Sequence, residues 1–273
     1  MTSQRVRTTD FAKMKRRGQK ITVLTAYDAT MARLFDRAGI DALLVGDSLG
    51  MVVLGYDTTL PVTLDAMIHH TRAVSRGAER ALIVADMPFM TYQVTVEDAA
   101  RNAGRLLQEG RAHAVKIEGG RSVVDVVQRL VDIGIPVMGH LGVVPQSVHQ
   151  MGGYTKRGTA PQERDAILAD AIALEQAGVF SIVLESIANE LARTVTAQVS
   201  VPTIGIGAGP DCDGQVLVSY DMLGLFDRFV PPFVKQYAHL ADTVITATET
   251  YIEDVRTGRY PLEALPTTGT PTA

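Results

Sequence analysis

The chain has 273 residues, of which 46% are hydrophobic and 21% are charged, and its formal net charge is −4. This composition is that of an ordinary globular protein, and the acidic balance argues against a general nucleic-acid binder, which needs a basic face. A chain of this length can bury one sizeable core, so we expect a single domain over residues 1–260. Residues 261–273 are rich in Pro, Thr and Gly and are expected to form a disordered tail.

The cellular compartment is indicated by two features. Cys212 is the sole cysteine, which excludes an internal disulfide framework and fits a reducing environment. The N-terminal residues lack the apolar core of a signal peptide, and no run approaches about 18 consecutive apolar residues, the length that spans a membrane. We therefore expect a soluble, cytoplasmic protein.

Short apolar runs alternate along the chain with helical segments, most of which are followed by a glycine, a favoured residue just past a helix end. The expected strands are Ile21–Thr25, Ala42–Val45, Leu82–Ala85, Ala114–Glu118, Pro136–His140, Phe180–Glu185, Val201–Ile206 and, more weakly, Gln215–Val218. The expected helices are Asp10–Arg17, Ala29–Ala38, Pro61–Ser75, Val96–Gln108, Val123–Val131, Gln162–Gln176, Asn189–Gln198 and one or more helices over Phe233–Arg256.

Repeated strand–helix units predict an α/β fold with parallel strands joined by right-handed crossovers. Eight such units would close a (β/α)₈ barrel of the TIM type, with Asp10–Arg17 as a lid over its bottom. An open, doubly wound sheet is the alternative. The segment Leu141–Thr159 is longer than an ordinary connection, which suggests a functional loop.

Polar side chains follow the expected strands where each strand ends. Ligands of α/β proteins bind at the carboxyl ends of strands, which in a barrel form one rim. The candidate site residues at these ends are Asp47, Ser48, Asp86, Lys116, Glu118, His140 and Glu185.

Three carboxylates on adjacent strands, Asp47, Asp86 and Glu118, would repel one another unless a cation neutralised them. Oxygen ligands of this kind suit Mg²⁺, which keeps water or substrate oxygens in its remaining positions. A zinc site is not indicated, since the sequence has one Cys and no His-Glu-x-x-His run. The alternative is that these acids cap helices or pair with surface arginines.

Each of the other candidates has more than one possible role. Lys116 lies two residues before Glu118, so both side chains face the same side of a strand, where the lysine could bind an anionic substrate or form a structural ion pair. Glu185 follows apolar residues that would raise its pKa toward that of a general base, although it could be a buried, satisfied acid. His140 could hold substrate, orient a neighbour or be structural.

Two short motifs do not carry the function their letters suggest. The sequence Gly46-Asp47-Ser48-Leu49 matches the GDSL esterases, but the Asp that such enzymes place three residues before a C-terminal His is Gln236 here. The run Gly205–Gly209 resembles a dinucleotide-binding fingerprint, yet position 210 is Pro where the third glycine would stand. We interpret this run as a loop that approaches a ligand closely.

Longer phrases of the chain, in this order, resemble the ketopantoate hydroxymethyltransferase family over residues 10–260. The phrases are Leu24–Asp28, Val45–Gly50, Val84–Phe89, Val115–Gly120, Gly139–Gly142, Gly205–Gly209 and Asp211–Gln215. The resemblance implies transfer of a hydroxymethyl group from 5,10-methylenetetrahydrofolate to 3-methyl-2-oxobutanoate, giving 2-dehydropantoate for pantothenate and coenzyme A synthesis.

The resemblance also implies roles for single residues. Asp47 and Asp86 match the positions that bind Mg²⁺ and, through it, the substrate, and Glu118 matches a third metal-associated acid. Ser48 and Lys116 match contacts to the oxo acid, and Glu185 matches the general base of an enolate mechanism. Family members resemble large rings of dimers, which implies a homo-oligomer, a decamer by this resemblance. No nucleic-acid or membrane partner is expected.

Two rival functions stay open at this point. One is a Mg²⁺-dependent 2-oxo acid lyase or mutase of the phosphoenolpyruvate mutase type, which would share the barrel, the metal and the enolate but act without folate. The other is a barrel that has lost activity and serves as a binding or assembly module. The full set of acids, with Lys116 and Glu185, argues against the second.

Overall fold

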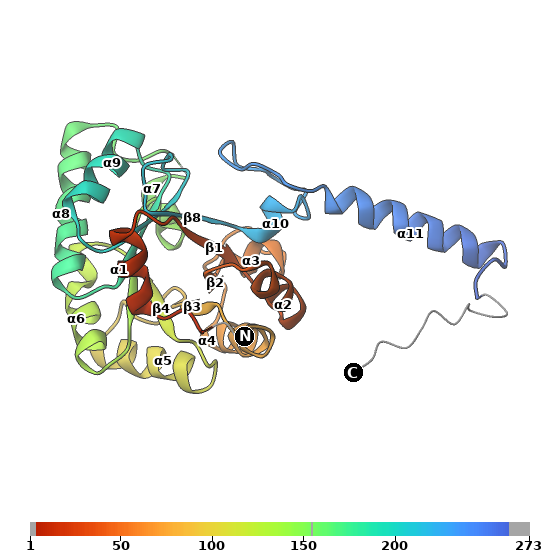
Figure 1. Ribbon diagram of the computed structural model, residues 1–273, viewed down its shortest axis with the longest axis horizontal. Coiled ribbons are helices and arrows are strands. Elements are labelled where there is room, and N and C mark those ends of the chain that lie inside the picture. Colours follow the sequence, from red (N-terminus) through yellow and green to blue (C-terminus); the bar gives the residue numbers. More distant parts are fainter. Residues whose placement is uncertain (1–3, 154, 262–273) are drawn as a thin grey trace. The chain divides into compact units, whose positions relative to one another are not determined.

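A computed structural model describes residues 4–153 and 155–261. Its central feature is a closed barrel of eight parallel strands that follow one another around the barrel in chain order (Figure 1). The strands are β1 Ile21–Thr25, β2 Ala42–Val45, β3 Leu82–Asp86, β4 Ala114–Glu118, β5 Val137–Gly142, β6 Ser181–Glu185, β7 Thr203–Ile206 and β8 Gly214–Leu217. The expected (β/α)₈ barrel is confirmed, and the open sheet is excluded because β1 pairs with β8.

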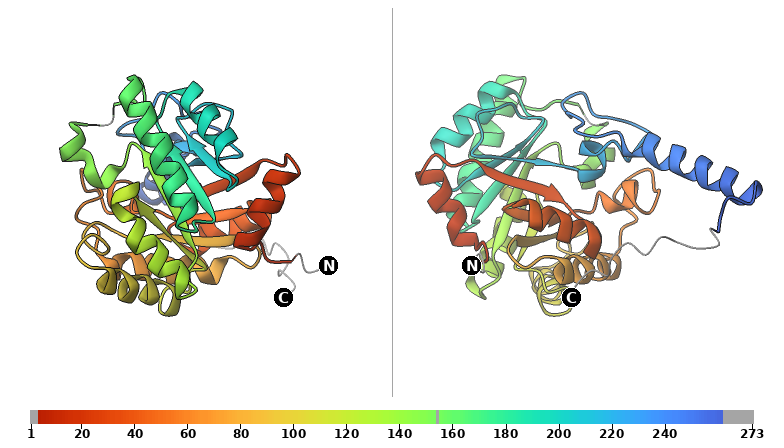
Figure 2. Two further views of the ribbon diagram at one scale, coloured as in Figure 1. Left: turned by 90° about the vertical axis from the view of Figure 1, so that its left-hand side faces the viewer. Right: turned by 45° about the vertical axis from the view of Figure 1, so that its right-hand side comes forward.

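Helices alternate with the strands along the chain, and those that precede residue 200 surround the barrel (Figure 2). The helices of the described chain are α1 Thr8–Arg16, α2 Ala29–Ala38, α3 Leu49–Val52, α4 Leu64–Gly77, α5 Val96–Gln108, α6 Val124–Asp132, α7 Val148–Met151, α8 Pro161–Gln176, α9 Asn189–Gln198, α10 Ser219–Met222 and α11 Leu240–Arg256, with 3₁₀ turns η1 Arg121–Val123 and η2 Pro145–Ser147. Local signals set the helix boundaries: the Asp28 carboxylate accepts the first free amides of α2, and Gly39 ends this helix at φ +93°, as the sequence predicted.

The expected strands and the other expected helices agree with the structure to within three residues at each end, and two segments differ more. The C-terminal helix begins at Leu240 and not at Phe233, because the backbone amides of Tyr237 and Leu240 donate to the carbonyls of Met222 and Leu223 and so leave the helical path. The expected loop Leu141–Thr159 begins inside β5 and contains η2 and α7. The helix is therefore shorter than expected, and so is the irregular part of the loop. In both places the backbone groups find hydrogen-bond partners that the sequence pattern does not indicate.

The barrel core is built by alternation along each strand. Inward-facing residues two positions apart form one buried cluster, which includes Ile21, Val23, Ala42, Leu44, Leu82, Val84, Ala114, Met138, Val183, Ile204 and Val216. Continuing the same alternation toward the carboxyl ends leads to Asp86 after Val84, Lys116 and Glu118 after Ala114, and Glu185 after Val183. The polar side chains of the upper barrel therefore lie directly above the apolar cluster.

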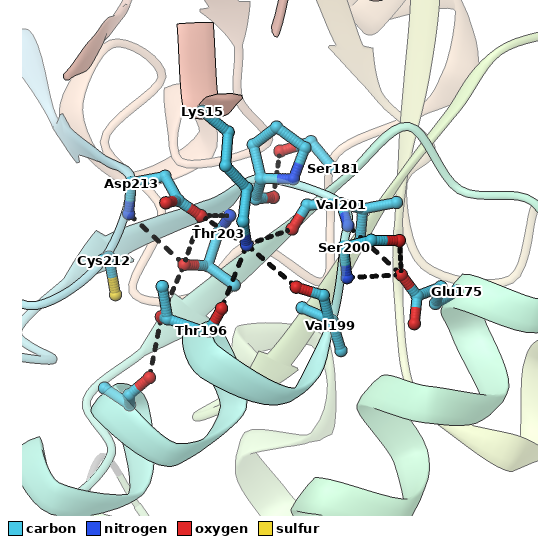
Figure 3. A network of polar contacts seen from close by, with 12 residues as sticks. Lys15, Glu175, Ser181, Thr196, Val199, Ser200, Val201, Thr203, Cys212 and Asp213 are labelled. Atoms are coloured by element: carbon cyan, nitrogen blue, oxygen red, sulfur yellow. Dashed lines mark hydrogen bonds and ion pairs between the residues drawn. The ribbon is translucent and has the colours of Figure 1, made fainter. Parts of the chain in front are cut away.

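Helix α1 closes the lower end of the barrel, as expected for a lid. Phe11 is fully buried in the barrel cluster, where its ring meets that of Phe180 edge to face at 5.6 Å. Lys15 fastens the same helix through its ammonium, which donates to the carbonyl oxygens of Thr196, Val199 and Val201 at 2.9–3.0 Å (Figure 3). It also pairs with the Asp213 carboxylate at 3.0 Å.

The chain divides into two compact units, Met1–Ser219 and Tyr220–Ala273. The first holds the barrel. The second contains α11, none of whose residues is buried. The expectation of one domain over residues 1–260 stays a prediction, because compactness and independent folding are different properties. The expected disordered tail lies outside the described residues from position 262 onward. Within the described chain, no helix is long and apolar enough to cross a membrane.

Candidate active site

The register of the central strands brings the predicted residues together at one rim. Asp86 pairs with Lys116 across β3 and β4, and Glu118 pairs with His140 across β4 and β5. Glu185, at the end of β6, lies opposite Gly142. Asp47 directly follows β2 and reaches the same group through its backbone amide, which donates to Asp86 Oδ2 at 3.0 Å. Six of the seven predicted side chains are thus linked by direct contacts, and Asp47, Asp86, Lys116, Glu118 and His140 are buried.

Each of the three acids uses one oxygen for a protein N–H group. Asp86 Oδ2 accepts from the Asp47 amide, Asp47 Oδ2 accepts from Gln146 Nε2 at 2.9 Å, and Glu118 Oε2 accepts from the Gln146 amide at 3.0 Å. The second oxygens of Asp86 and Glu118 are buried without a hydrogen-bond partner. Buried acceptors of this kind are costly unless something binds them. The arrangement therefore holds the carboxylates in place, and Asp86 Oδ1 and Glu118 Oε1 keep only ion-pair contacts, with Lys116 at 3.2 Å and His140 at 3.3 Å.

Lys116 supplies positive charge next to these acids. Its ammonium lies 3.2 Å from Asp86 Oδ1 and 3.9 Å from Glu118 Oε1. Burial acts to lower the pKa of Lys116, but the charges of Asp86, Glu118 and Asp47 outweigh it and raise that pKa, so the side chain is a cation. One ammonium does not offset the acids: burial raises the pKa of Asp47 well above its usual range, and the charges of Asp86 and Glu118 raise it further.

His140 joins the acid cluster to Glu185. Its Nδ1 lies 3.0 Å from Lys116 Nζ and 3.3 Å from Glu118 Oε1, and its Nε2 lies 3.2 Å from Glu185 Oε2. Burial and the Lys116 charge act to lower the pKa of His140, but the carboxylates of Glu118 and Glu185 outweigh them and raise it. The Glu185 side chain is 20% exposed, against 4–5% for Glu118 and Asp86. Glu185 is thus the acid of this group most open to a ligand.

Ser48 stands at the edge of the cluster. Its hydroxyl lies 2.9 Å from the hydroxyl of Tyr27, in a half-buried position at the start of α3. A glycine precedes Asp47 in this turn, because a Cβ at residue 46 would lie only 2.8 Å from Ser48 Oγ. The recorded partner of Ser48 is a phenol and not a histidine, so nothing in the described geometry supports an esterase nucleophile.

Gln146 and Tyr92 belong to the site but were not expected from the sequence. Gln146 lies in η2 and is 5% exposed, with its side chain directed into the acid cluster. The Tyr92 hydroxyl donates to Gln146 Oε1 at 2.8 Å, and burial raises the pKa of Tyr92 well above 10. No charge or motif marks either residue. The one available signal was the unusual length of Leu141–Thr159, which was interpreted as functional without a residue being named.

Comparison with known proteins decides the family. The family model described as ketopantoate hydroxymethyltransferase matches residues 5–263. The chain belongs to the ketopantoate hydroxymethyltransferase family. It is 60% identical over 248 residues to the 3-methyl-2-oxobutanoate hydroxymethyltransferase of Moorella thermoacetica, covering 91% of this chain and 92% of that protein. The enzyme of that name from Syntrophus aciditrophicus is 58% identical, with 91% of each chain covered. The resemblance found in the sequence is therefore confirmed, and the chain is a hydroxymethyltransferase.

Solved structures similar to this family member come from the phosphoenolpyruvate mutase and isocitrate lyase superfamily. A 2,3-dimethylmalate lyase of that superfamily matches with a TM-score of 0.59 at 18% identity, over 97% of this chain and 92% of its own. A phosphonopyruvate hydrolase, solved with oxalate and Mg²⁺, matches with a TM-score of 0.62 at 13% identity, over 96% and 92%. At such identities the likeness concerns the barrel fold alone.

Proposed function

We propose that the protein transfers a hydroxymethyl group from 5,10-methylenetetrahydrofolate to 3-methyl-2-oxobutanoate, giving 2-dehydropantoate. Family membership supports the class of reaction. The observation that carries the substrate is the position of Glu185, a partly exposed carboxylate 3.2 Å from His140, beside a buried cation and acids that each have a buried oxygen without a hydrogen-bond partner. This combination suits a substrate that has an anionic end and a weakly acidic C–H group.

The acids also fit a divalent cation, and we propose Mg²⁺. Among the described residues, no group of three or more His, Cys, Asp or Glu side chains is placed so that it could hold a metal ion without other ligands. Magnesium does not require this, because it is commonly held by one or two carboxylates with water and substrate oxygens completing the octahedron. Asp47 and Asp86 would hold it, with Glu118 behind them, and the unpartnered Asp86 and Glu118 oxygens support that assignment. When bound, the ion would withdraw electron density from the keto group and acidify the neighbouring C3–H bond.

The protein's own groups would then carry out the following steps. Lys116 and Ser48 bind and orient the substrate carboxylate, and Glu185 removes the C3 proton. His140, in contact with Glu185 Oε2, holds the base in position. The one-carbon unit loses both of its bonds to the folate nitrogens, takes the oxygen of its new hydroxyl group from water, and forms a C–C bond to the C3 carbon of the enolate. Tetrahydrofolate leaves with two protons, one that came from C3 and one that came from the water.

The test is a pair of measurements on the purified protein. The wild type should form 2-dehydropantoate only when 3-methyl-2-oxobutanoate and methylenetetrahydrofolate are both present with Mg²⁺. Glu185→Gln should still bind the oxo acid but should no longer exchange its C3 hydrogen with solvent deuterium. Undiminished exchange in this variant would remove Glu185 as the base.

A lyase or mutase of the phosphoenolpyruvate mutase type is the second candidate, because solved structures of that superfamily share the barrel. Turnover of a 2-oxo acid without folate would favour it. The inactive binding module would be favoured by absence of both turnover and Mg²⁺ binding.

We also propose a homo-oligomer, a decamer by family resemblance. Support comes from α11, on which Val244, Ile245, Tyr251 and Val255 are all more than two-fifths exposed. Such apolar side chains are normally covered by a partner. Light scattering after size-exclusion chromatography would test the proposal, and a monomeric mass at micromolar concentration would refute it.

The free thiol of Cys212 agrees with the cytoplasm as the proposed location.

A further inference from the structure

Gln146 connects more elements of the site than any single acid does. Its Nε2 donates to Asp47 Oδ2 and to the carbonyl oxygen of Met87, both at 2.9 Å. Its backbone amide donates to Glu118 Oε2 at 3.0 Å. One residue of the segment after β5 thereby holds the carboxylate that follows β2, the backbone that follows β3 and the carboxylate that ends β4.

The orientation of this amide is determined by its surroundings. The nitrogen faces two acceptors, Asp47 Oδ2 and Met87 O, and the oxygen faces two donors, the Tyr92 hydroxyl at 2.8 Å and Gln93 Nε2 at 3.2 Å. Rotation by 180° would place oxygen against oxygen on one side and N–H against donors on the other. The Tyr92 hydroxyl therefore keeps the N–H₂ group directed at Asp47.

A neutral donor suits this position for an electrostatic reason. A buried carboxylate needs a hydrogen-bond donor to fix its direction, and an Arg or Lys would provide one. A second cation here would, however, cancel the negative charge that attracts a divalent cation to Asp47, Asp86 and Glu118. An amide fixes one oxygen of Asp47 and adds no net charge. The other carboxylate oxygen is left for a ligand.

We propose that Gln146 is a positioning residue that aligns Asp47 and Glu118 for cation binding, and that Tyr92 acts through it by fixing the direction of the Gln146 amide. The proposal rests on the cation site of the proposed function. It makes the segment Pro145–Ser147 a structural part of the site, although its side chains touch neither substrate nor base in the reaction described above.

The test measures Mn²⁺ binding by electron paramagnetic resonance, with Mn²⁺ as the spectroscopic substitute for Mg²⁺. Gln146→Met keeps the size of the side chain and removes its donors, and groups that orient metal ligands typically contribute 10–100-fold to affinity or activity. We expect the Mn²⁺ dissociation constant to rise about 10–100-fold in Gln146→Met. Gln150→Met is the matched control, because Gln150 is exposed in the same segment, and it should bind Mn²⁺ as the wild type does.

Tyr92→Phe provides the second arm, and it also serves if Gln146→Met does not fold. The Tyr92 hydroxyl also contacts the backbone carbonyl and amide of Glu118 at 3.2 and 3.3 Å, but its shortest contact is with Gln146 Oε1 at 2.8 Å. Loss of this shortest hydrogen bond should weaken Mn²⁺ binding about fivefold. The double variant should bind no more weakly than Gln146→Met alone, because the hydroxyl acts through the amide. A folded Gln146→Met that binds Mn²⁺ within twofold of the wild type would overturn the proposal, as would unchanged binding in Tyr92→Phe. If the wild type itself fails to bind Mn²⁺, the cation site of the proposed function is wrong, and the positioning role falls with it.

Discussion

Replacing Lys116 by Met should destabilise the barrel strongly, although the new side chain is apolar and of similar length. In the wild type the ammonium lies 3.2 Å from Asp86 Oδ1 and 3.9 Å from Glu118 Oε1, with about 5% of each side chain exposed. At an effective dielectric constant of about 20 these contacts correspond to attractions of about 5 and 4 kcal/mol, which desolvation of the three groups offsets in large part. The variant keeps the desolvated acids and loses their cation.

Removal of one partner of a buried ion pair typically costs about 3–5 kcal/mol, and we expect Lys116→Met to lose stability in this range. Urea-induced unfolding followed by far-ultraviolet circular dichroism would measure it, since the chain contains no tryptophan for fluorescence. Lys13→Met is the control: Lys13 pairs with Asp10 at 2.7 Å but is 51% exposed, so its loss should cost less than about 1 kcal/mol. If the two variants were equally stable, the reasoning that the buried acids depend on Lys116 would be refuted.

Two further changes test the geometry and the charge of other positions. Gly142→Ala should lower activity at least about tenfold, because its Cβ would collide with the carbonyl oxygen of Glu185 and displace this proposed base by a fraction of an ångström or more. Gly152→Ala, also at positive φ but in open space, should keep activity. Burial raises the pKa of Asp221 to about 6, so folding takes up a proton and stability falls as pH rises from about 4 to 6. Asp221→Asn should therefore be more stable than wild type by about 1–3 kcal/mol at pH 8 and gain less than half of that at pH 4.5, as thermal midpoints would show; a gain independent of pH would contradict this.

The sequence predicted the barrel and most of the site because both follow from strand periodicity. The runs that end in Asp86, Glu118 and Glu185 are apolar, so the strands are visible, and a polar residue at the carboxyl end of such a run stands out. Parallel pairing in chain order then places these ends on one rim. The contacts between Asp86, Lys116, Glu118, His140 and Glu185 needed no information beyond register.

The part that could not be predicted depends on irregular backbone. Gln146 is an uncharged residue in a 3₁₀ turn, and its role arises from five partners, which lie after β2, after β3 and at the end of β4. No local spacing encodes such an arrangement. The predicted start of α11 was wrong for a related reason, since the amides of Tyr237 and Leu240 bond to carbonyls that only the folded second unit presents. The sequence pattern predicts a helix from Phe233, but the helix begins only at Leu240.

The fastening of α1 by Lys15 has a consequence for the order in which the chain is made. Helix α1 is synthesised first, yet the carbonyl oxygens that receive its ammonium come 181 to 186 residues later, at Thr196, Val199 and Val201. While the ribosome is still translating the central strands, Lys15 and Phe11 have no completed surface on which to dock. The first helix must therefore wait with its apolar side chain uncovered until β7 emerges. The lower end of the barrel is sealed only when about three-quarters of the polypeptide exists, about 20 s into synthesis at a rate of about 10 residues per second.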